Sequence, residues 1–396
     1  MFRSSTLVLF LLLLAGFPSI AAAQGDGILL SIEPGRTPGD VELVWTGGQP
    51  PFRVFRSPEA ASVTSPAKQL GQTSNRLWTD SVPAADLSFY RVTGLVTVEE
   101  TTLSYGSNSA HSMELYTAQD LPTVPMPTVV LAHGGLWQSG DKSALETLCR
   151  NVVLESGGTQ ACASINYRLS QDLGGVCSAP GVDTYVDQVT DMAAAYALLQ
   201  NDSDTYGLDP TRMHIGGHSA GGHLSHELNL RWSDFEQACT NPSGCFPAAG
   251  AIGFEGIYDV EAWDAYDSSI WGGQFFCATR KAFGFPADSA SHCTDSAYGL
   301  PCWDVGSPIY LAQQSGTLGI APVGNALIIH SPGDTWVDIA EAAYFGAAMS
   351  DAFPGIFSIT STDGTCATGQ HNDPLSQVAL AICIVNFVAS GGAAIW

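Results

Sequence analysis

The chain has few charged residues, and basic residues are especially scarce. Asp, Glu, Lys and Arg make up only 13% of its 396 residues, and 14 Lys and Arg stand against 38 Asp and Glu, giving a net charge of −24. Nucleic-acid binding requires Lys and Arg to meet the phosphates, so this composition argues against a nucleic-acid partner. We interpret the acidity as a well-solvated surface. The hydrophobic content of 45% argues against disorder and for a large core.

Long hydrophobic runs are absent except at the start. Arg3 precedes an apolar run over residues 7–16, and the small residues Ala21, Ala22 and Ala23 follow. This order predicts an export signal, residues 1–23, cleaved near Ala23, and a secreted or periplasmic protein. The run is short for a bilayer and no later run is longer, so we expect no membrane span after cleavage; a retained anchor is the alternative.

Cysteine is absent before residue 149, although ten cysteines follow. An exported chain can pair them in up to five disulfides, and the sequence does not reveal the pairing. Cys239 and Cys245 bracket the turn-like TNPSG, which favours a local bridge between them. No CxxC with matching His spacing occurs, so no metal site is predicted.

Residues 24–97 have an all-β pattern. Short strands rich in β-branched and aromatic residues are expected at 41–46, 52–56, 76–80 and 87–92. With Trp45, FRVFRS and FYRV, this stretch resembles a fibronectin type III-like sandwich. We interpret it as a non-catalytic spacer, with a polymer- or surface-binding module as the alternative.

Residues 98–396 follow a different pattern, in which strands alternate with helices. Strands are expected within 127–135, 161–169, 213–218 and 324–334, and helices at 186–200, after residue 219 and at 375–390. This alternation predicts an α/β fold with a mostly parallel sheet flanked by helices, preceded by the small β-sandwich.

The segment Gly217-His218-Ser219-Ala220-Gly221 fits G-x-S-x-G between an expected strand and helix. In that setting a sharp turn exposes the serine as a nucleophile, and small neighbours let strand and helix crowd together. A glycine-rich turn with a capping serine is the structural alternative.

HGGLWQSGDKS, residues 133–143, follows an expected buried strand. Acyl transfer builds negative charge on a carbonyl oxygen, which backbone N–H groups stabilise. We predict an oxyanion hole at Gly134, Gly135, Leu136 and Ala220, with the N–H of Gly135 or Leu136 and that of Ala220 as donors. An ordinary turn between strand and helix is the alternative.

A catalytic acid and a histidine are expected in two later loops. HSPGDTWVD, residues 330–338, offers Asp334, with Asp338 as the second choice, and TGQHNDP offers His371. The order serine, acid, histidine is that of α/β-hydrolases. The other histidines are expected to have structural roles, and His330 to fix the acid loop.

Together these motifs resemble an α/β-hydrolase esterase over residues 98–396. The likeness is to the group of arylformamidases, feruloyl-esterase-like enzymes and carboxylesterases. HGGLW, NYRL, YGLDPTRMHIGGHSAGGHLS, GIYDV, SPGD and QHND carry it. The resemblance implies a cap insertion, expected at about 261–305. Trp137, His218 and Trp336 are candidates for the substrate pocket.

The combined prediction is a serine esterase that needs no cofactor. Ser219, Asp334 and His371 would form and hydrolyse an acyl-enzyme. The substrate would be a small, aryl or feruloyl, or polymeric ester. An amide hydrolase and a non-catalytic binding protein are the alternatives. The sequence does not indicate an oligomeric state.

Overall fold

The computed structural model describes most of the chain, with its gaps mainly toward the N-terminus. The described residues are 20–23, 29–34, 37, 40–46, 52–57, 69–81, 89–94, 96–122, 124–170, 183–242, 244–284 and 293–394. Most of the expected export signal, residues 1–19, and Cys177 lie outside them.

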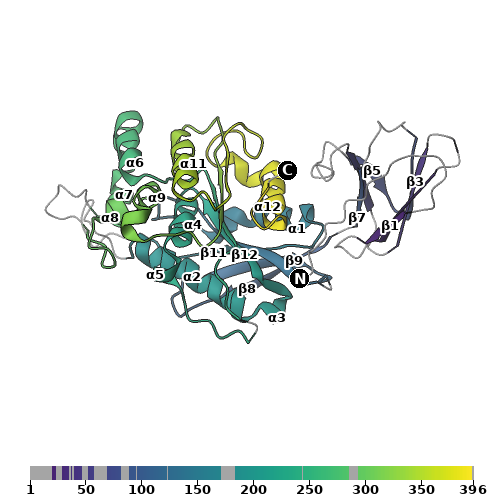
Figure 1. Cartoon of the computed structure of the whole chain (residues 1–396), viewed down its shortest axis with the longest axis horizontal. Coiled ribbons are helices and arrows are strands. Elements are labelled where there is room, and N and C mark those ends of the chain that lie inside the picture. Colours follow the sequence, from purple (N-terminus) through teal and green to yellow (C-terminus); the bar gives the residue numbers. More distant parts are fainter. Residues whose placement is uncertain are drawn as a thin grey trace.

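Two small antiparallel sheets precede residue 96, with the strand orders β1-β2-β3-β6 and β5-β4-β7. Their strands are β1 (Ile20–Ala23), β2 (Leu29–Pro34), β3 (Val41–Thr46), β4 (Phe52–Ser57), β5 (Gln69–Thr73), β6 (Leu77–Asp80) and β7 (Phe89–Thr93). Leu43 and Trp45 of one sheet share a core with Phe52 and Val92 of the other. The two sheets therefore pack face to face as the expected small sandwich, drawn in purple in Figure 1.

Strand β1 bears on the expected signal cleavage. Ile20–Ala23 pair antiparallel with Leu29–Ile32 of β2, so this stretch forms an edge of the small sheet. Cleavage after Ala23 would remove β1 and leave β2 at that edge. The export signal therefore stays a prediction, and the N-terminus of the exported protein decides whether β1 is retained.

The remaining strands form one eight-stranded sheet with the order β15-β14-β13-β12-β10-β11-β9-β8. They are β8 (Val98–Ser104), β9 (Ser112–Ala118), β10 (Met126–Ala132), β11 (Ala161–Ile165), β12 (Leu208–His218), β13 (Gly250–Phe254), β14 (Asn325–Ile329) and β15 (Ser358–Ser361). Pairing is antiparallel at the β8–β9–β11 edge and parallel from β11 to β15. This confirms the expected mostly parallel sheet.

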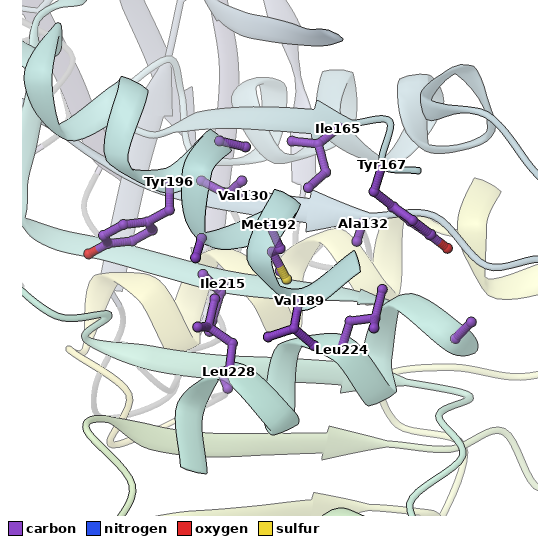
Figure 2. Packing of buried hydrophobic residues seen from close by; sticks show 14 of the residues in the cluster. Val130, Ala132, Ile165, Tyr167, Val189, Met192, Tyr196, Ile215, Leu224 and Leu228 are labelled. Carbon is purple, nitrogen blue, oxygen red and sulfur yellow. The ribbon is translucent and has the colours of Figure 1, made fainter. Parts of the chain in front are cut away.

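Helices supply the crossovers that parallel strands require. They are η3 (Lys142–Leu145), α1 (Glu146–Glu155), α2 (Tyr185–Asn201), α3 (Ser203–Tyr206), α4 (Ala220–Leu230), α5 (Trp232–Phe235), α9 (Pro308–Gln313), α10 (Ser315–Leu318), α11 (Ala340–Ala352), η5 (Asp373–Ser376) and α12 (Val378–Ala389). Alternation along β10 assigns the two faces. Val130 and Ala132 pack with α2 and α4, whereas Val129 and Leu131 pack with α1 and α12. Figure 2 shows Val189 and Met192 of α2 and Leu224 of α4 beside the strand residue Ile215.

The expected cap, residues 261–305, lies between β13 and β14. Its described part contains α6 (Val260–Tyr266), the π-helical turn η4 (Asp267–Trp271), α7 (Phe276–Phe283) and α8 (Cys302–Val305). Trp263 and Phe283 reach into the same core as α2 and α4, so the cap is packed onto the sheet domain.

Within the part of the chain that the structure describes, four disulfides join cysteines that are close in sequence. They are Cys149–Cys162, Cys239–Cys245, Cys293–Cys302 and Cys366–Cys383. The expected bridge between Cys239 and Cys245 is confirmed, and Cys277 is disulfide-bonded as well. The bridges tie α1 to β11, and the loop after β15 to α12.

None of the helices within the described ranges is long and apolar enough to cross a membrane.

Candidate active site

Ser219 occupies a sharp turn between β12 and α4. Its backbone has φ 53° and ψ −118°, a conformation that non-glycine residues rarely adopt. Two hydrogen bonds hold it: the Ser219 N–H donates to Phe254 O at 2.9 Å, and the His223 N–H donates to Ser219 O at 3.1 Å. Strained backbone of this kind persists when the surroundings over-determine it, and it gathers at functional sites.

The glycines around Ser219 are required by the crowding of this turn. A Cβ on Gly217 would lie 2.5 Å from Ala132 O, and a Cβ on Gly221 would overlap the same oxygen. Strand β10, the turn and helix α4 therefore approach one another more closely than any side chain allows. The sequence pattern predicted this crowding, and its cause is the carbonyl end of β10.

Asp334 and His371 come from loops at the same edge of the sheet, after β14 and before η5. His371 Nδ1 lies 2.8 Å from Asp334 Oδ2, and because a carboxylate only accepts, that nitrogen carries the proton. Burial alone would raise the pKa of Asp334. Hydrogen bonds from His330 and His371 outweigh this effect and hold the pKa well below its usual range. The carboxylate is therefore ionised and fixes one tautomer of His371.

His218 connects the serine turn to the His371 loop. Its ring lies 4.7 Å from the His371 ring, centroid to centroid, and its Nε2 is 2.8 Å from His371 O. Burial lowers the pKa of His218 to about 3, so the ring is neutral and its Nε2–H can donate to that carbonyl. His218, expected in the substrate pocket, is 3% exposed and lies between the two loops. The residue directly before Ser219 therefore contacts His371, and His371 contacts Asp334.

Asp338, the second choice for the acid, lies at the start of α11. Its Oδ1 accepts from the Ala340 N–H at 2.9 Å, as a helix-capping carboxylate does. Asp334 is the carboxylate that contacts His371.

The loop that begins with His133-Gly134-Gly135, residues 133–143, is called the HGG loop here. It adopts three consecutive left-handed conformations after Gly134. Their φ angles are 126° at Gly135, 52° at Leu136 and 62° at Trp137. A Cβ on Gly134 would lie 2.6 Å from His218 Nδ1 and 2.9 Å from Ser219 Cβ, so this loop runs directly against the serine.

Three backbone N–H groups of the serine turn and the neighbouring HGG loop have no acceptor among the described residues. Among the described residues, the N–H groups of Gly135, Leu136 and Ala220 donate no hydrogen bond. Ala220 is also the first residue of α4, where backbone N–H groups are free and the dipole is positive. These features suit the binding of a developing oxyanion.

Two further residues complete the surroundings of Asp334, and sequence reasoning missed one of them. Glu255 directly follows β13, is fully buried, and lies with His330 and Asp334 in a group whose polar atoms are within 4.8 Å of one another. His330 Nε2 is 3.2 Å from Asp334 Oδ2 and 3.2 Å from Val337 O. His330 thus fixes the acid loop, as expected. The sequence feature that could have pointed to Glu255 is its position as an acidic residue directly after a buried strand.

The group could in principle ligate a metal ion, because it offers one nitrogen and two carboxylates. However, His330 Nε2 lies 3.2–3.3 Å from both carboxylates, at hydrogen-bonding distance. His330 Nε2 and the two carboxyl groups therefore lie close enough to bind one another, and this geometry gives no reason to propose a metal ion.

Aromatic rings extend from His371 toward the cap. Trp336 stacks on His371 with an interplanar angle of 5° at 5.9 Å, and Phe275 stacks on Trp336 at 5.8 Å. Trp271 contacts both of the latter rings, and Trp336 is 41% exposed. Trp336, a pocket candidate from the sequence, therefore contacts His371 and is partly exposed.

Trp137, the remaining pocket candidate, lies elsewhere. Its indole is fully buried, and its Nε1–H donates to His223 Nδ1 at 3.3 Å. Phe283 of the cap packs edge-on against it at 4.8 Å. The left-handed backbone of the HGG loop directs this side chain into the core. Trp137 therefore packs beneath its own loop and is inaccessible to solvent.

Comparison with known proteins gives a family match over part of the chain. The BD-FAE family model matches residues 113–279, which include the HGG loop and Ser219 and end before Asp334. Esterase LipC of Mycobacterium tuberculosis is 27% identical over 158 residues, which are 40% of this chain and 36% of LipC. The chain thus spans little more than a third of that relative.

A second relative is matched over more of its length. Kynurenine formamidase avaC of Aspergillus versicolor is 25% identical over 266 residues, 63% of this chain and 84% of avaC. Among solved structures, a truncated carbohydrate esterase from gut microbiota superimposes with a TM-score of 0.52 at 16% identity, covering 75% of this chain and 97% of that one. This likeness establishes a shared fold.

Proposed function

The chain has the α/β-hydrolase fold and a BD-FAE match over residues 113–279, and on that premise we propose that it is an exported serine hydrolase of carboxylic esters. Relatives named as esterases support this assignment. The observation that carries it is the 2.8 Å contact between His371 Nδ1 and Asp334 Oδ2, and it is supported by the contact of His371 with His218, the neighbour of the strained Ser219.

In the proposed reaction, His371 Nε2 takes the proton of the Ser219 hydroxyl as its oxygen attacks the ester carbonyl. The new C–O bond gives a tetrahedral oxyanion, which the N–H groups of Ala220 and of Gly135 or Leu136 stabilise. His371 then protonates the leaving alcohol, and the acyl group remains on Ser219. Water, deprotonated by His371, releases the acid in the reverse sequence, while Asp334 stabilises the imidazolium.

The partly exposed ring of Trp336 suggests where an aromatic part of the substrate would bind. The ring stacks on His371 and continues into Phe275 and Trp271, so an aryl group could stack beside the reacting carbonyl. Small aryl or feruloyl esters and esters on a polymer are the proposed substrates. The disulfides support export, because paired cysteines persist in oxidising compartments.

The test is turnover of para-nitrophenyl esters of increasing acyl length and of a feruloyl ester. Wild-type protein should hydrolyse the esters, whereas Ser219→Ala should lower kcat/KM by roughly 10³-fold or more because the nucleophile is gone. Ser315→Ala, at the start of α10, is the matched control and should match wild type. Ester turnover retained in Ser219→Ala would remove the proposed mechanism.

An amide substrate is the second candidate, favoured by the likeness to a kynurenine formamidase along 84% of that relative. N-formylkynurenine belongs in the same assay. Turnover of the formyl amide without ester turnover would assign the protein to amide hydrolysis. A binding protein without catalysis would turn over neither class.

A further inference from the structure

Glu255 stands where two parts of the site meet. Phe254 O accepts the Ser219 N–H at 2.9 Å, and the next residue in the chain is Glu255. The Glu255 N–H donates to Ile329 O at 2.9 Å, at the end of the strand that leads to Asp334. The end of β13 therefore touches the backbone of the serine turn and that of the acid loop.

The side chain of Glu255 points at the acid loop and is fully buried. Its carboxyl group accepts from the Ser331 N–H at 3.0 Å and faces His330 Nε2 at 3.3 Å. Its polar atoms lie within 4.8 Å of those of His330 and Asp334, so the two carboxyl groups are neighbours. These neighbours, Ser331, His330 and Asp334, all belong to the loop that carries the acid.

Two adjacent buried carboxyl groups do not both ionise, because like charges repel and neither is solvated. The Asp334 carboxylate is favoured by His371, His330 and the Trp336 N–H, which donates to Oδ1 at 2.8 Å. Glu255 receives fewer donors. Burial, together with the hydrogen bond to Asp334 and its charge, raises the pKa of Glu255 to about 9. The raised pKa of Glu255 and the lowered pKa of Asp334 favour a single proton on Glu255 at neutral pH.

The backbone conformation of Glu255 is strained, so its placement costs folding free energy. Its φ is 55°, in the region where glycine and asparagine are favoured over glutamate. A strained backbone and a buried carboxyl group are both destabilising, so the position of Glu255 beside Asp334 calls for a role.

On the basis of the proposed function, we infer that Glu255 is a positioning residue. As a neutral acid it donates its O–H to Asp334. Together with His330 it holds the Asp334 carboxylate in the position from which that carboxylate orients His371. His330 Nε2–H faces the two carboxyl groups and Val337 O, all acceptors, so it supplies the second side-chain donor from behind. Asp334 is then fixed by donors on several sides, and His371 is the one that takes part in proton transfer.

The experiment compares Glu255→Gln with Glu255→Ala for ester hydrolysis from pH 5 to pH 10.5. Glutamine keeps the shape, donates an N–H to Asp334 and accepts from Ser331, so kcat should stay within a few-fold of wild type. Alanine removes both bonds and should lower kcat roughly 10- to 100-fold, as expected for a lost buried hydrogen bond. KM should stay unchanged in both, since Glu255 does not reach the substrate.

The pH profile separates positioning from mere packing. In wild type the proton on Glu255 is lost above about pH 9, leaving two charges side by side, so kcat/KM should fall there. Glu255→Gln cannot ionise, and its plateau should extend further. The titratable groups facing Glu255 are Asp334, His330 and Tyr258, and none of these changes in the variant.

A readout without turnover keeps this inference separate from the proposed function. In ¹⁵N-histidine-labelled protein, the His371 Nδ1–H shared with Asp334 should give a low-field proton resonance. It should persist in Glu255→Gln and broaden or shift in Glu255→Ala, even if no ester is hydrolysed. Wild-type kcat, pH profile and resonance in folded Glu255→Ala would overturn the inference. So would equal losses in both variants that follow a fall in melting temperature.

Discussion

At the scale of single residues, backbone strain is concentrated around the site. Leu136, Trp137, Ser219 and Glu255 all have positive φ, and of the non-glycine residues described only Asp183 joins them. Such conformations cost of order 1 kcal/mol or more each, so the fold sustains them together at one place. Two of the four lie in the HGG loop, and the other two follow neighbouring strands.

Replacement of Asp334 tests the proposed catalytic acid directly, because its carboxylate contacts His371. In Asp334→Asn the amide can present its N–H₂ group to His371, which favours the wrong tautomer, so kcat should fall by roughly 10³- to 10⁴-fold. The measurement is the steady-state kinetics of ester hydrolysis, with folding checked by circular dichroism.

Asp338→Asn is the control for this change, because Asp338 caps the start of α11 and does not contact His371. It should alter kcat less than about threefold and leave stability nearly unchanged, because the asparagine oxygen can accept the same N–H. A silent Asp334→Asn beside an inactive Asp338→Asn would exchange the two assignments.

At the scale of elements, the turn from β12 to α4 depends on how closely three backbones meet. The carbonyl of Ala132 occupies the space that a side chain on Gly217 or Gly221 would need. A G-x-S-x-G pattern shows that small residues occur, but the neighbour that requires them belongs to β10, some 85 residues earlier in the chain.

Gly221→Ala tests this close approach. The added methyl group would overlap Ala132 O, so strand and helix must separate, at a cost of about 1–3 kcal/mol, and the melting temperature should fall by several degrees. Activity should fall too, because the same shift moves Ser219 and the Ala220 N–H. Thermal unfolding followed by calorimetry gives the value.

Gly316→Ala is the matched substitution, since nothing lies within 4 Å of its Cβ position and its φ is not positive. It lies in α10, where alanine should be neutral or slightly stabilising. Equal destabilisation by both substitutions would contradict the crowding argument.

At the scale of the whole molecule, the eight-stranded sheet supplies the described site by itself. The HGG loop, the serine turn and the loops of Asp334 and His371 all lie at or beyond β10. Arg53 of the small sandwich forms an ion pair at 3.8 Å with Glu155, the last residue of α1, and such pairs contribute little stability. Figure 1 shows the sandwich beside α1 and β9, at one end of the molecule.

Removal of residues 24–95 from the exported chain should leave kcat/KM for a small soluble ester within about twofold. The cut is placed before Val96 because this residue packs beneath the sheet and Thr97 O accepts from the Gln119 N–H. Turnover of an ester on an insoluble polymer should fall if the sandwich binds that surface. Misfolding of the shortened chain would instead make the sandwich a structural part of the hydrolase.

The sequence alone determined the fold class and the order of the chemical groups. Alternating strand and helix patterns gave the parallel sheet, because the period of apolar residues reflects which faces are buried. The three motifs carrying HGG, Ser219 and His371 were recognisable because each combines an unusual residue with a strand end. The element limits differ from the expected ones by a few residues, since chain ends of elements depend on local hydrogen bonds.

Only the tertiary structure decided which residues act on one another. Asp334 and Asp338 both lie in one loop, and the choice between them rests on a contact with a histidine 37 residues away. Trp137 turned out to be buried because the backbone of its loop is left-handed, which no local pattern discloses. Glu255 acquires its role from two carboxyl groups that meet across neighbouring strands, and a pairing across such a distance in sequence is set by the sheet order.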